Sequence, residues 1–194
     1  PGERLFEAVE RAMGPLAIVA ENLGVITPAV EAIRKRFGMP GMAVLQFAFG
    51  KDPQAPSFLP HNYPREVVAC TGTHDNDTTV GWFHSRVGSG TTRSAEQIER
   101  ERDFALRYLH SDGREIHWDL IRLAMASVSR LAVFPMQDVL GLGSEARMNL
   151  PSTTEGNWRW RMAAGQWTAD HERRLYELAD TYDREMFPSA SSSP

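Results

Sequence analysis

The sequence predicts an α/β fold with parallel strands, arranged as half of a (β/α)8 barrel. Short apolar runs of strand length alternate along the chain with segments of helical period. Two of these runs end abruptly on acidic residues, Glu21 and Asp75, as strands do at the carboxyl rim of a barrel. Four such strands cannot close a barrel, and the polar, Trp-rich segment 156–161 is typical of a rim rather than of a cover for an open sheet.

The first part of the chain predicts two strands, each preceded by a helix. Gly14 and Pro15 stop the first helical segment, and the apolar run that follows has strand length. Thr27 is a good N-cap residue with Pro28 at the first helical position, which favours a helix start there. The expected elements are a helix over 4–13, a strand over 16–20, a helix from Thr27 to Gly38 and a strand over 42–49.

The second part continues the alternation after a proline-rich loop. The expected elements are a strand over 67–73, a short helix over 78–84, helices over 94–110 and 118–130, a strand over 131–137, a helical turn over 138–143 and a last helix over 169–184. Residues 188–194, composed of Pro, Ser and Ala, are expected to be a disordered tail. Residues 1–187 are expected to form the folded part.

Charge and composition exclude several classes of partner. The net charge is -4, with 21 basic and 25 acidic residues and no run of like charges, so neither nucleic acid nor an anionic membrane is expected to bind. Apolar runs fall far short of the roughly 18 residues that span a bilayer, and the first residues lack a signal-peptide pattern. The single cysteine, Cys70, cannot form an internal disulfide, which favours a reducing, cytoplasmic location.

Glu21 and Asp75 are the candidate catalytic residues, and each has a plainer alternative. Glu21 could be a solvated acid at the rim, and Asp77 is expected to cap the helix that begins near residue 78. His61 and His74, with the nearby aspartates, invite a metal site, but His-x-x-x-His and Cys ligand spacings are absent. We therefore expect no metal and no cofactor.

Five blocks of the sequence resemble one enzyme family. These blocks are AENLGVITPAVEAIRKRFGMPGMAVLQFAF (20–49), LPHNYP (59–64), TGTHDNDTTVGW (71–82), SRLAVFPMQDVLGLGSEARMNLP (129–151) and EGNWRWR (155–161). They resemble the C-terminal half of the 4-alpha-glucanotransferases, or amylomaltases, of glycoside hydrolase family 77 in the α-amylase clan. The resemblance implies strands 5 to 8 of the catalytic barrel, with the N-terminal half expected as a partner.

The resemblance also implies an activity and its residues. Family members transfer α-1,4-glucan segments between acceptors by a retaining mechanism, with maltooligosaccharides as substrates and no cofactor. By similarity Glu21 is the general acid/base, and Asp75 binds sugar hydroxyls and helps distort the ring. His74 and Asn157 resemble the family's substrate-binding residues. Trp82, Trp158 and Trp160 could stack on sugar rings or pack in the core, and Arg147 and Arg159 are more typical of rim ion pairs.

One part of the family pattern is absent. The nucleophilic Asp of an R-x-D strand ending does not occur in these 194 residues, so the chain alone is expected to be inactive. The sequence leaves open a truncated protein, a separate second half, or a genuinely shortened protein. An α-amylase-like hydrolase and a non-catalytic glucan-binding fragment are the alternative functions. A phosphate-binding barrel is disfavoured, because its glycine-rich phosphate loops are too weakly represented.

Overall fold

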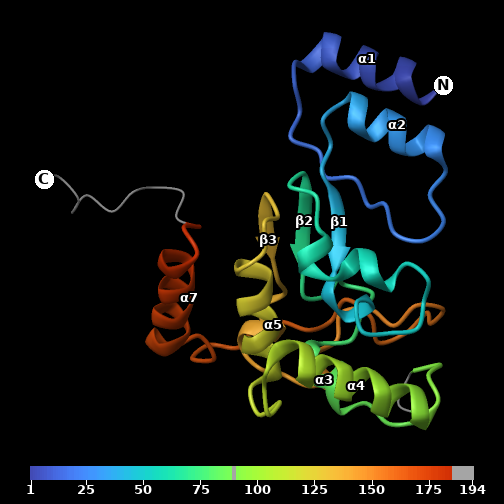
Figure 1. Ribbon diagram of the computed structural model, residues 1–194. Helices are drawn as coiled ribbons and strands as arrows, with labels where there is room; N and C mark the ends of the chain where they lie inside the picture. Colours follow the sequence, from blue (N-terminus) through green and yellow to red (C-terminus); the bar gives the residue numbers. More distant parts are fainter. Residues whose placement is uncertain (89–90, 185–194) are drawn as a thin grey trace, which may run out of the picture.

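A three-stranded parallel sheet forms the centre of the chain in the computed structural model, which describes residues 1–88 and 91–184 (Figure 1). The strands are β1 (Gly41–Val44), β2 (Val67–Cys70) and β3 (Leu131–Val133), in the order β1-β2-β3. Val44 lies opposite Cys70, and Cys70 lies opposite Val133. The parallel pairing confirms the expected α/β class.

Seven α-helices surround this sheet within the described residues. They are α1 (Gly2–Met13), α2 (Pro28–Arg36), α3 (Thr79–His84), α4 (Ala95–Leu109), α5 (Ile116–Met125), α6 (Met136–Val139) and α7 (Ala169–Thr181). In Figure 1, α1 and α2 lie together beyond the start of the strands, whereas α3 and α4 lie at the opposite end. The predicted cap is confirmed, because the Thr27 hydroxyl accepts a hydrogen bond from the Val30 amide at 3.4 Å.

The main core lies between the sheet and α3, α4 and α5. Strand side chains alternate between two faces, so Ala43 and Ala69 face this core while Val44 and Cys70 belong to a smaller cluster on the other face. The helices contribute large buried side chains to the main core, namely Trp82, Phe83, Leu109, Ile116 and Leu120. Burial on this side therefore fixes the sheet against its helices.

The last helix, α7, is anchored to α5 by two arginines. The Arg174 guanidinium lies 4.2 Å from the centre of the Trp118 ring, a cation–π contact. Arg184 follows α7 and donates hydrogen bonds to the carbonyl of Met125, the last residue of α5, and to the carbonyls of Ser127 and Ser129 beyond it. The bond to Met125 satisfies a carbonyl that the end of a helix leaves without an intrahelical partner.

The strand predicted over residues 16–20 is wrong. This segment has no regular secondary structure and makes one backbone bond to the sheet region, from the Ala20 amide to the Pro40 carbonyl at 2.9 Å. Leu16 and Val19 remain exposed. A strand of a barrel needs a neighbour on each side, and the described residues provide only β1 for this segment. The sheet accordingly has three strands instead of the four expected.

The other predicted strands begin correctly but are too long. After β1, residues Leu45–Phe47 turn into a 3-10 helix, with the Ala48 amide bonded to the Leu45 carbonyl. After β3, Pro135 precedes α6 and has no amide hydrogen to donate to a neighbouring strand. A run of hydrophobic residues indicates burial and not backbone geometry. The predicted strands therefore extend past the residues at which the strands end.

The predicted helices are present, with ends shifted by a few residues. The helix expected over 118–130 is α5 and ends at Met125, and the turn expected over 138–143 is α6. No helix in the described part of the chain is both long and apolar enough to cross a membrane. The tail expected over 188–194 lies outside the described residues.

Candidate active site

A short loop at the carboxyl end of β2 presents His74 and Asp75. The Asn76 side-chain oxygen closes this loop by accepting hydrogen bonds from the Thr73 amide and hydroxyl, both at 2.9 Å. At Gly72 a Cβ atom would lie 2.8 Å from the side-chain nitrogen of Gln46, so a larger residue would have to displace the Gln46 amide, which donates to the Asp77 carbonyl at 2.9 Å. The side chains of His74 and Asp75 are about half exposed, at 50% and 51%.

A buried carboxylate forms hydrogen bonds to residues on both sides of this loop, and sequence reasoning missed it. Asp138, in α6, is 1% exposed and accepts hydrogen bonds from the Thr71 hydroxyl (2.5 Å), the Thr79 amide (2.7 Å) and the Thr79 hydroxyl (2.9 Å). Thr71 precedes the loop and Thr79 follows it. Burial raises the pKa of Asp138, and these hydrogen bonds oppose the rise.

Replacing Asp138 by alanine is expected to destabilise the fold by about 3 kcal/mol or more, because three buried donors lose their acceptor. Asp138→Asn keeps one acceptor oxygen and should cost less. The raised pKa means that Asp138 contributes most stability below its ordinary value of 3.8 and loses that contribution as pH rises through the folded-state value. Urea unfolding across pH should show this slope in the parent and not in Asp138→Asn; equal slopes would contradict the assignment.

Asp75 is held by residues that lie more than seventy positions later in the chain. Its Oδ1 atom accepts a hydrogen bond from the Asn149 side chain at 2.6 Å, and its backbone carbonyl accepts one from Arg147 at 2.6 Å. The Nε2 atom of His74 lies 3.4 Å from the same Oδ1 atom. The His74 ring also packs against Trp158, with ring centres 5.1 Å apart.

The Asn157 side chain organises the loop in which it lies. Its oxygen accepts a hydrogen bond from the Leu150 amide at 2.9 Å, and its nitrogen donates to the Thr153 carbonyl and hydroxyl at 3.1 and 3.0 Å. The next residue, Trp158, has φ of 62° and bonds through its amide to the Met148 carbonyl at 2.6 Å. Asn157 thereby places Trp158 beside His74, and one lone pair of its oxygen is left for another donor.

Asp77 does not cap α3, contrary to expectation. Thr78 is the N-cap residue, and its hydroxyl accepts a hydrogen bond from the Gly81 amide at 3.0 Å. The Asp77 carboxylate instead accepts bonds from the Thr78 amide and the Ser144 hydroxyl, at 2.8 and 2.7 Å. Among the described residues no cluster of His, Cys, Asp and Glu has the arrangement of a metal site.

A groove of about 920 Å³ opens beside Asp75, which is within the size range of small-molecule sites. Its lining combines aromatic, amide and charged side chains from distant segments, including Gln46, Phe47, Lys51, Asp75, Arg147 and Gln97. Aromatic faces flanked by hydrogen-bonding groups suit a polar ligand that also has apolar faces. Asp75 is therefore the candidate site residue that both lines a cavity and has a fixed orientation.

Glu21 is not brought to this groove. Hydrogen bonds on either side of it, from Ala20 to the Pro40 carbonyl and from the Met42 amide to the Asn22 side chain (2.8 Å), hold it beside the first residues of β1. Its side chain is exposed and makes no hydrogen bond or ion pair with the described residues. The structure thus places Glu21 and Asp75 near opposite ends of the strands, which corrects the expectation of one shared rim.

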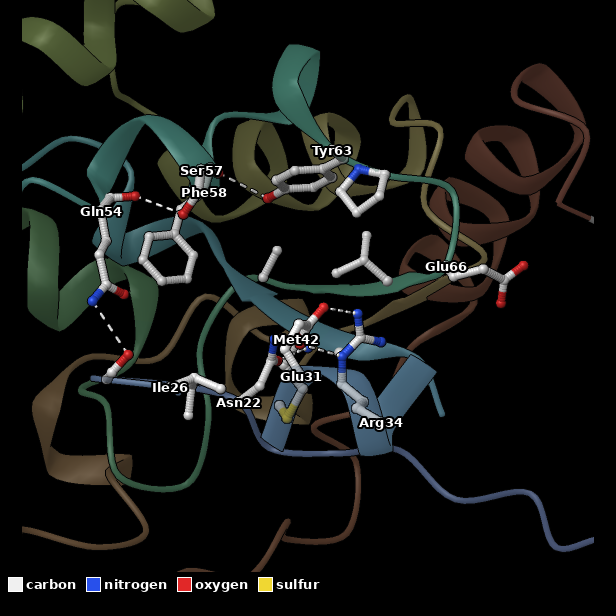
Figure 2. A pocket seen from close by; sticks show the side chains of 15 residues that line it. Asn22, Ile26, Glu31, Arg34, Met42, Gln54, Ser57, Phe58, Tyr63 and Glu66 are labelled. Carbon is white, nitrogen blue, oxygen red and sulfur yellow. Dashed lines mark hydrogen bonds and ion pairs between the residues drawn. The ribbon is translucent and has the colours of Figure 1, made fainter. Parts of the chain in front are cut away.

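A second cavity, of about 340 Å³, lies next to Asn22 (Figure 2). Its charged groups are already paired: Arg34 binds Glu31 at 2.5 Å, and Glu66 binds Arg130 at 3.0 Å. Figure 2 shows the Arg34 guanidinium bonded to the Glu31 carboxylate. Because these charged side chains are already in ion pairs, few charged groups remain to bind a ligand in this cavity. The groove beside Asp75 is therefore the better candidate site.

Comparison with known proteins identifies the family. The family model described as 4-alpha-glucanotransferase, glycoside hydrolase family 77, matches residues 1–167. The chain belongs to this family. The 4-alpha-glucanotransferase of Thermus thermophilus is 48% identical over 95% of this chain and 36% of its own length, and that of Synechocystis sp. is 49% identical over 96% and 35%. The chain thus spans about a third of the glucanotransferases that it matches.

Solved structures agree with this family assignment. The structure of amylomaltase from Streptococcus agalactiae in complex with acarbose matches this chain with a TM-score of 0.81 and 33% sequence identity. The match covers 94% of this chain and 35% of the amylomaltase chain. Amylomaltase from Corynebacterium glutamicum, at 20% identity and a TM-score of 0.58, shares the fold. The predicted family resemblance is therefore confirmed.

Two site residues were missed by sequence reasoning, although both lie within the family blocks. Asp138 is the only charged residue between Arg130 and Glu145, and this pattern could have marked it as a buried polar group. Asn149 lies between Met148 and Leu150 and has no local pattern that marks it. Its importance comes from a contact that only the fold creates.

Proposed function

We propose that this chain is the C-terminal part of the catalytic barrel of a 4-alpha-glucanotransferase, supplying its strands 5 to 8. The complete enzyme would move α-1,4-glucan segments to the 4-position of an acceptor glucan or glucose by a retaining double displacement. The observation that carries the proposal is the Asp75 carboxylate, fixed at the edge of the 920 Å³ groove in a member of this family. The acarbose complex of the Streptococcus agalactiae amylomaltase supports an oligosaccharide as ligand.

Asp75 lines the groove, whereas His74, Asn157 and Trp158 are outside its lining, and each has a distinct role in this proposal. Asp75 accepts hydrogen bonds from sugar hydroxyls through its Oδ2 atom, which has no partner within the described residues. His74 donates to the sugar at the cleavage point, and Asn157 binds sugar through the lone pair that its loop contacts leave free. Trp158, which is half exposed, offers an aromatic face to the apolar side of a pyranose ring.

Glu21 is the general acid/base of the proposed reaction, and it must move to serve as one. Retaining transfer needs two carboxyl groups about 5 to 5.5 Å apart across the scissile bond. We propose that residues 16–20 become a barrel strand when a second neighbouring strand pairs with them, and that this pairing carries Glu21 to the groove. The nucleophilic aspartate comes from a part of the enzyme outside this chain, so the chain alone is inactive.

Transfer and hydrolysis can be separated by counting reducing ends. The assembled enzyme is expected to convert maltotriose to glucose and longer oligomers while the total number of reducing ends stays constant. An α-amylase-like hydrolase would raise that number with every cleavage, and a glucan-binding fragment would change neither quantity. Chromatography of the products with a reducing-sugar assay measures both quantities. A rise in reducing ends equal to the glucose released would overturn the transferase assignment.

The proposed location is the cytoplasm of the source cell. Related glucanotransferases from Solanum tuberosum and Arabidopsis thaliana are described as chloroplastic or amyloplastic, so the same fold also works in plastids. Nucleic acid and membranes are not proposed as partners.

A further inference from the structure

The Asn149 side chain makes the shortest side-chain contact to the Asp75 carboxylate. Its amide nitrogen donates to the Oδ1 atom at 2.6 Å, and its backbone amide donates to the His74 carbonyl at 3.1 Å. One residue thus binds the side chain of Asp75 and the backbone of the residue before it. These two contacts restrict the side-chain torsion angles of Asp75 and the position of the backbone of its loop.

Asn149 is itself held by Arg147. The Nε atom of Arg147 donates to the Asn149 carbonyl at 2.8 Å, and its Nη2 atom donates to the Asp75 carbonyl at 2.6 Å. Between them, the Met148 carbonyl accepts the Trp158 amide at 2.6 Å. Residues 147–149 therefore bridge the loop of His74 and Asp75 and the loop of Trp158, whose ring packs against His74.

The choice of an amide at position 149 has a chemical reason. A neutral donor orients the Asp75 carboxylate through Oδ1 and leaves its charge and its Oδ2 atom for a ligand. A lysine or arginine at this position would neutralise the charge, whereas a carboxylate would repel it. The titratable and charged groups around the pair are His74, at 3.4 Å from Oδ1, and Arg147.

We propose that Asn149 is a positioning residue for Asp75, holding its carboxylate in the orientation that binds the substrate as the glucosyl group is transferred. This inference rests on the proposed glucanotransferase function. It predicts that loss of the amide donor lowers kcat and leaves KM almost unchanged. Displacement of a reacting or stabilising group by about 1 Å can cost about 100-fold in rate.

Two variants of similar size test this role by their pH dependence. Asn149→Leu removes the donor at every pH, and we expect kcat for maltotriose disproportionation to fall about 10- to 100-fold across the whole profile. Asn149→Asp places two carboxyl groups at hydrogen-bond distance, where they share one proton. The protonated form donates to Oδ1 as the amide does, so this variant should approach the parent rate at acidic pH. Its rate should fall as pH rises and the shared proton is lost.

The measured quantity is the ratio of variant to parent kcat at each pH, which cancels any pH dependence that the two proteins share. Asn62→Asp is the matched control, because the Asn62 amide donates to the Pro56 carbonyl at 2.8 Å, away from Asp75. Its ratio should be flat and close to one. Circular dichroism of each variant checks that the protein is folded.

The possible results separate the two proposals. An inactive assembled parent protein would overturn the proposed function, and the role of Asn149 with it. An active parent with a flat Asn149→Asp ratio, whether reduced or not, would overturn the positioning role and leave the function standing. A ratio that falls with rising pH only for Asn149→Asp supports the inference.

Discussion

Glu21→Gln is expected to lower the kcat of the assembled glucanotransferase by at least about 100- to 10,000-fold. Glutamine has nearly the same shape as glutamate but cannot give a proton to the departing glycosidic oxygen or take one from the acceptor hydroxyl. Both half-reactions of a retaining transfer need this proton movement. Glucose release from maltotriose under initial-rate conditions measures the loss.

A donor with a good leaving group distinguishes acid catalysis from a structural effect. An aryl maltooligosaccharide with an acidic phenol needs little protonation, so its first step should be much less impaired in Glu21→Gln. Glu66→Gln is a suitable control, since Glu66 is another exposed acid and forms an ion pair with Arg130. Its kcat should stay within about twofold of the parent, as surface ion pairs contribute little. A near-normal rate for Glu21→Gln with maltotriose would remove Glu21 from the mechanism.

This experiment also tests a movement of the chain. In the present structure Glu21 lies beside the start of β1, held there through its neighbours Ala20 and Asn22. Asp75 lies beyond the opposite, carboxyl end of β2. A large loss of activity would mean that Glu21 reaches the groove in the assembled enzyme. The segment before it would then change its register against β1, which shifts side chains by about 3.3 Å per residue.

Local sequence patterns predicted the features that depend on local physics. The cap at Thr27 and the end of the parallel strand before His74 and Asp75 both follow from residue type and spacing. The loop that carries Asp75 was found because a buried strand must stop where polar residues begin. The family resemblance supplied the proposed role of each residue, which spacing could not.

The contacts that fix the candidate site could not be predicted in this way. Asp138 and Thr71 are 67 residues apart, and Asn149 and Asp75 are 74 residues apart. Hydrophobic period says which face of an element is buried, but it does not say which distant side chain completes a hydrogen bond. The incorrect strand over 16–20 has the same origin, since strand formation depends on neighbours and not on the apolar run alone.

The isolated chain is expected to self-associate, because the outer edge of its sheet is unpaired. Within the described residues β3 pairs on one side with β2, and Leu131 and Val133 are 44% and 52% exposed. Unpaired apolar edges bind other strands, so light scattering of the 194-residue chain should reveal aggregates or dimers, or thermal melting should begin at low temperature. Maltotriose should remain unconverted, since no nucleophilic carboxylate is available.

Co-expression with the N-terminal part of the barrel should reverse all three properties, giving a soluble complex that melts cooperatively and disproportionates maltotriose. Val133→Lys provides the diagnostic variant, because a charge on the open edge blocks strand pairing. It should reduce self-association of the chain alone and also weaken its complex with the N-terminal part. The contrary result is an unmodified chain that is a monodisperse, cooperatively melting monomer and that the N-terminal part does not bind. In that case β3 is a natural edge strand that needs no further strand beside it. The half-barrel proposal would then give way to a self-sufficient α/β domain.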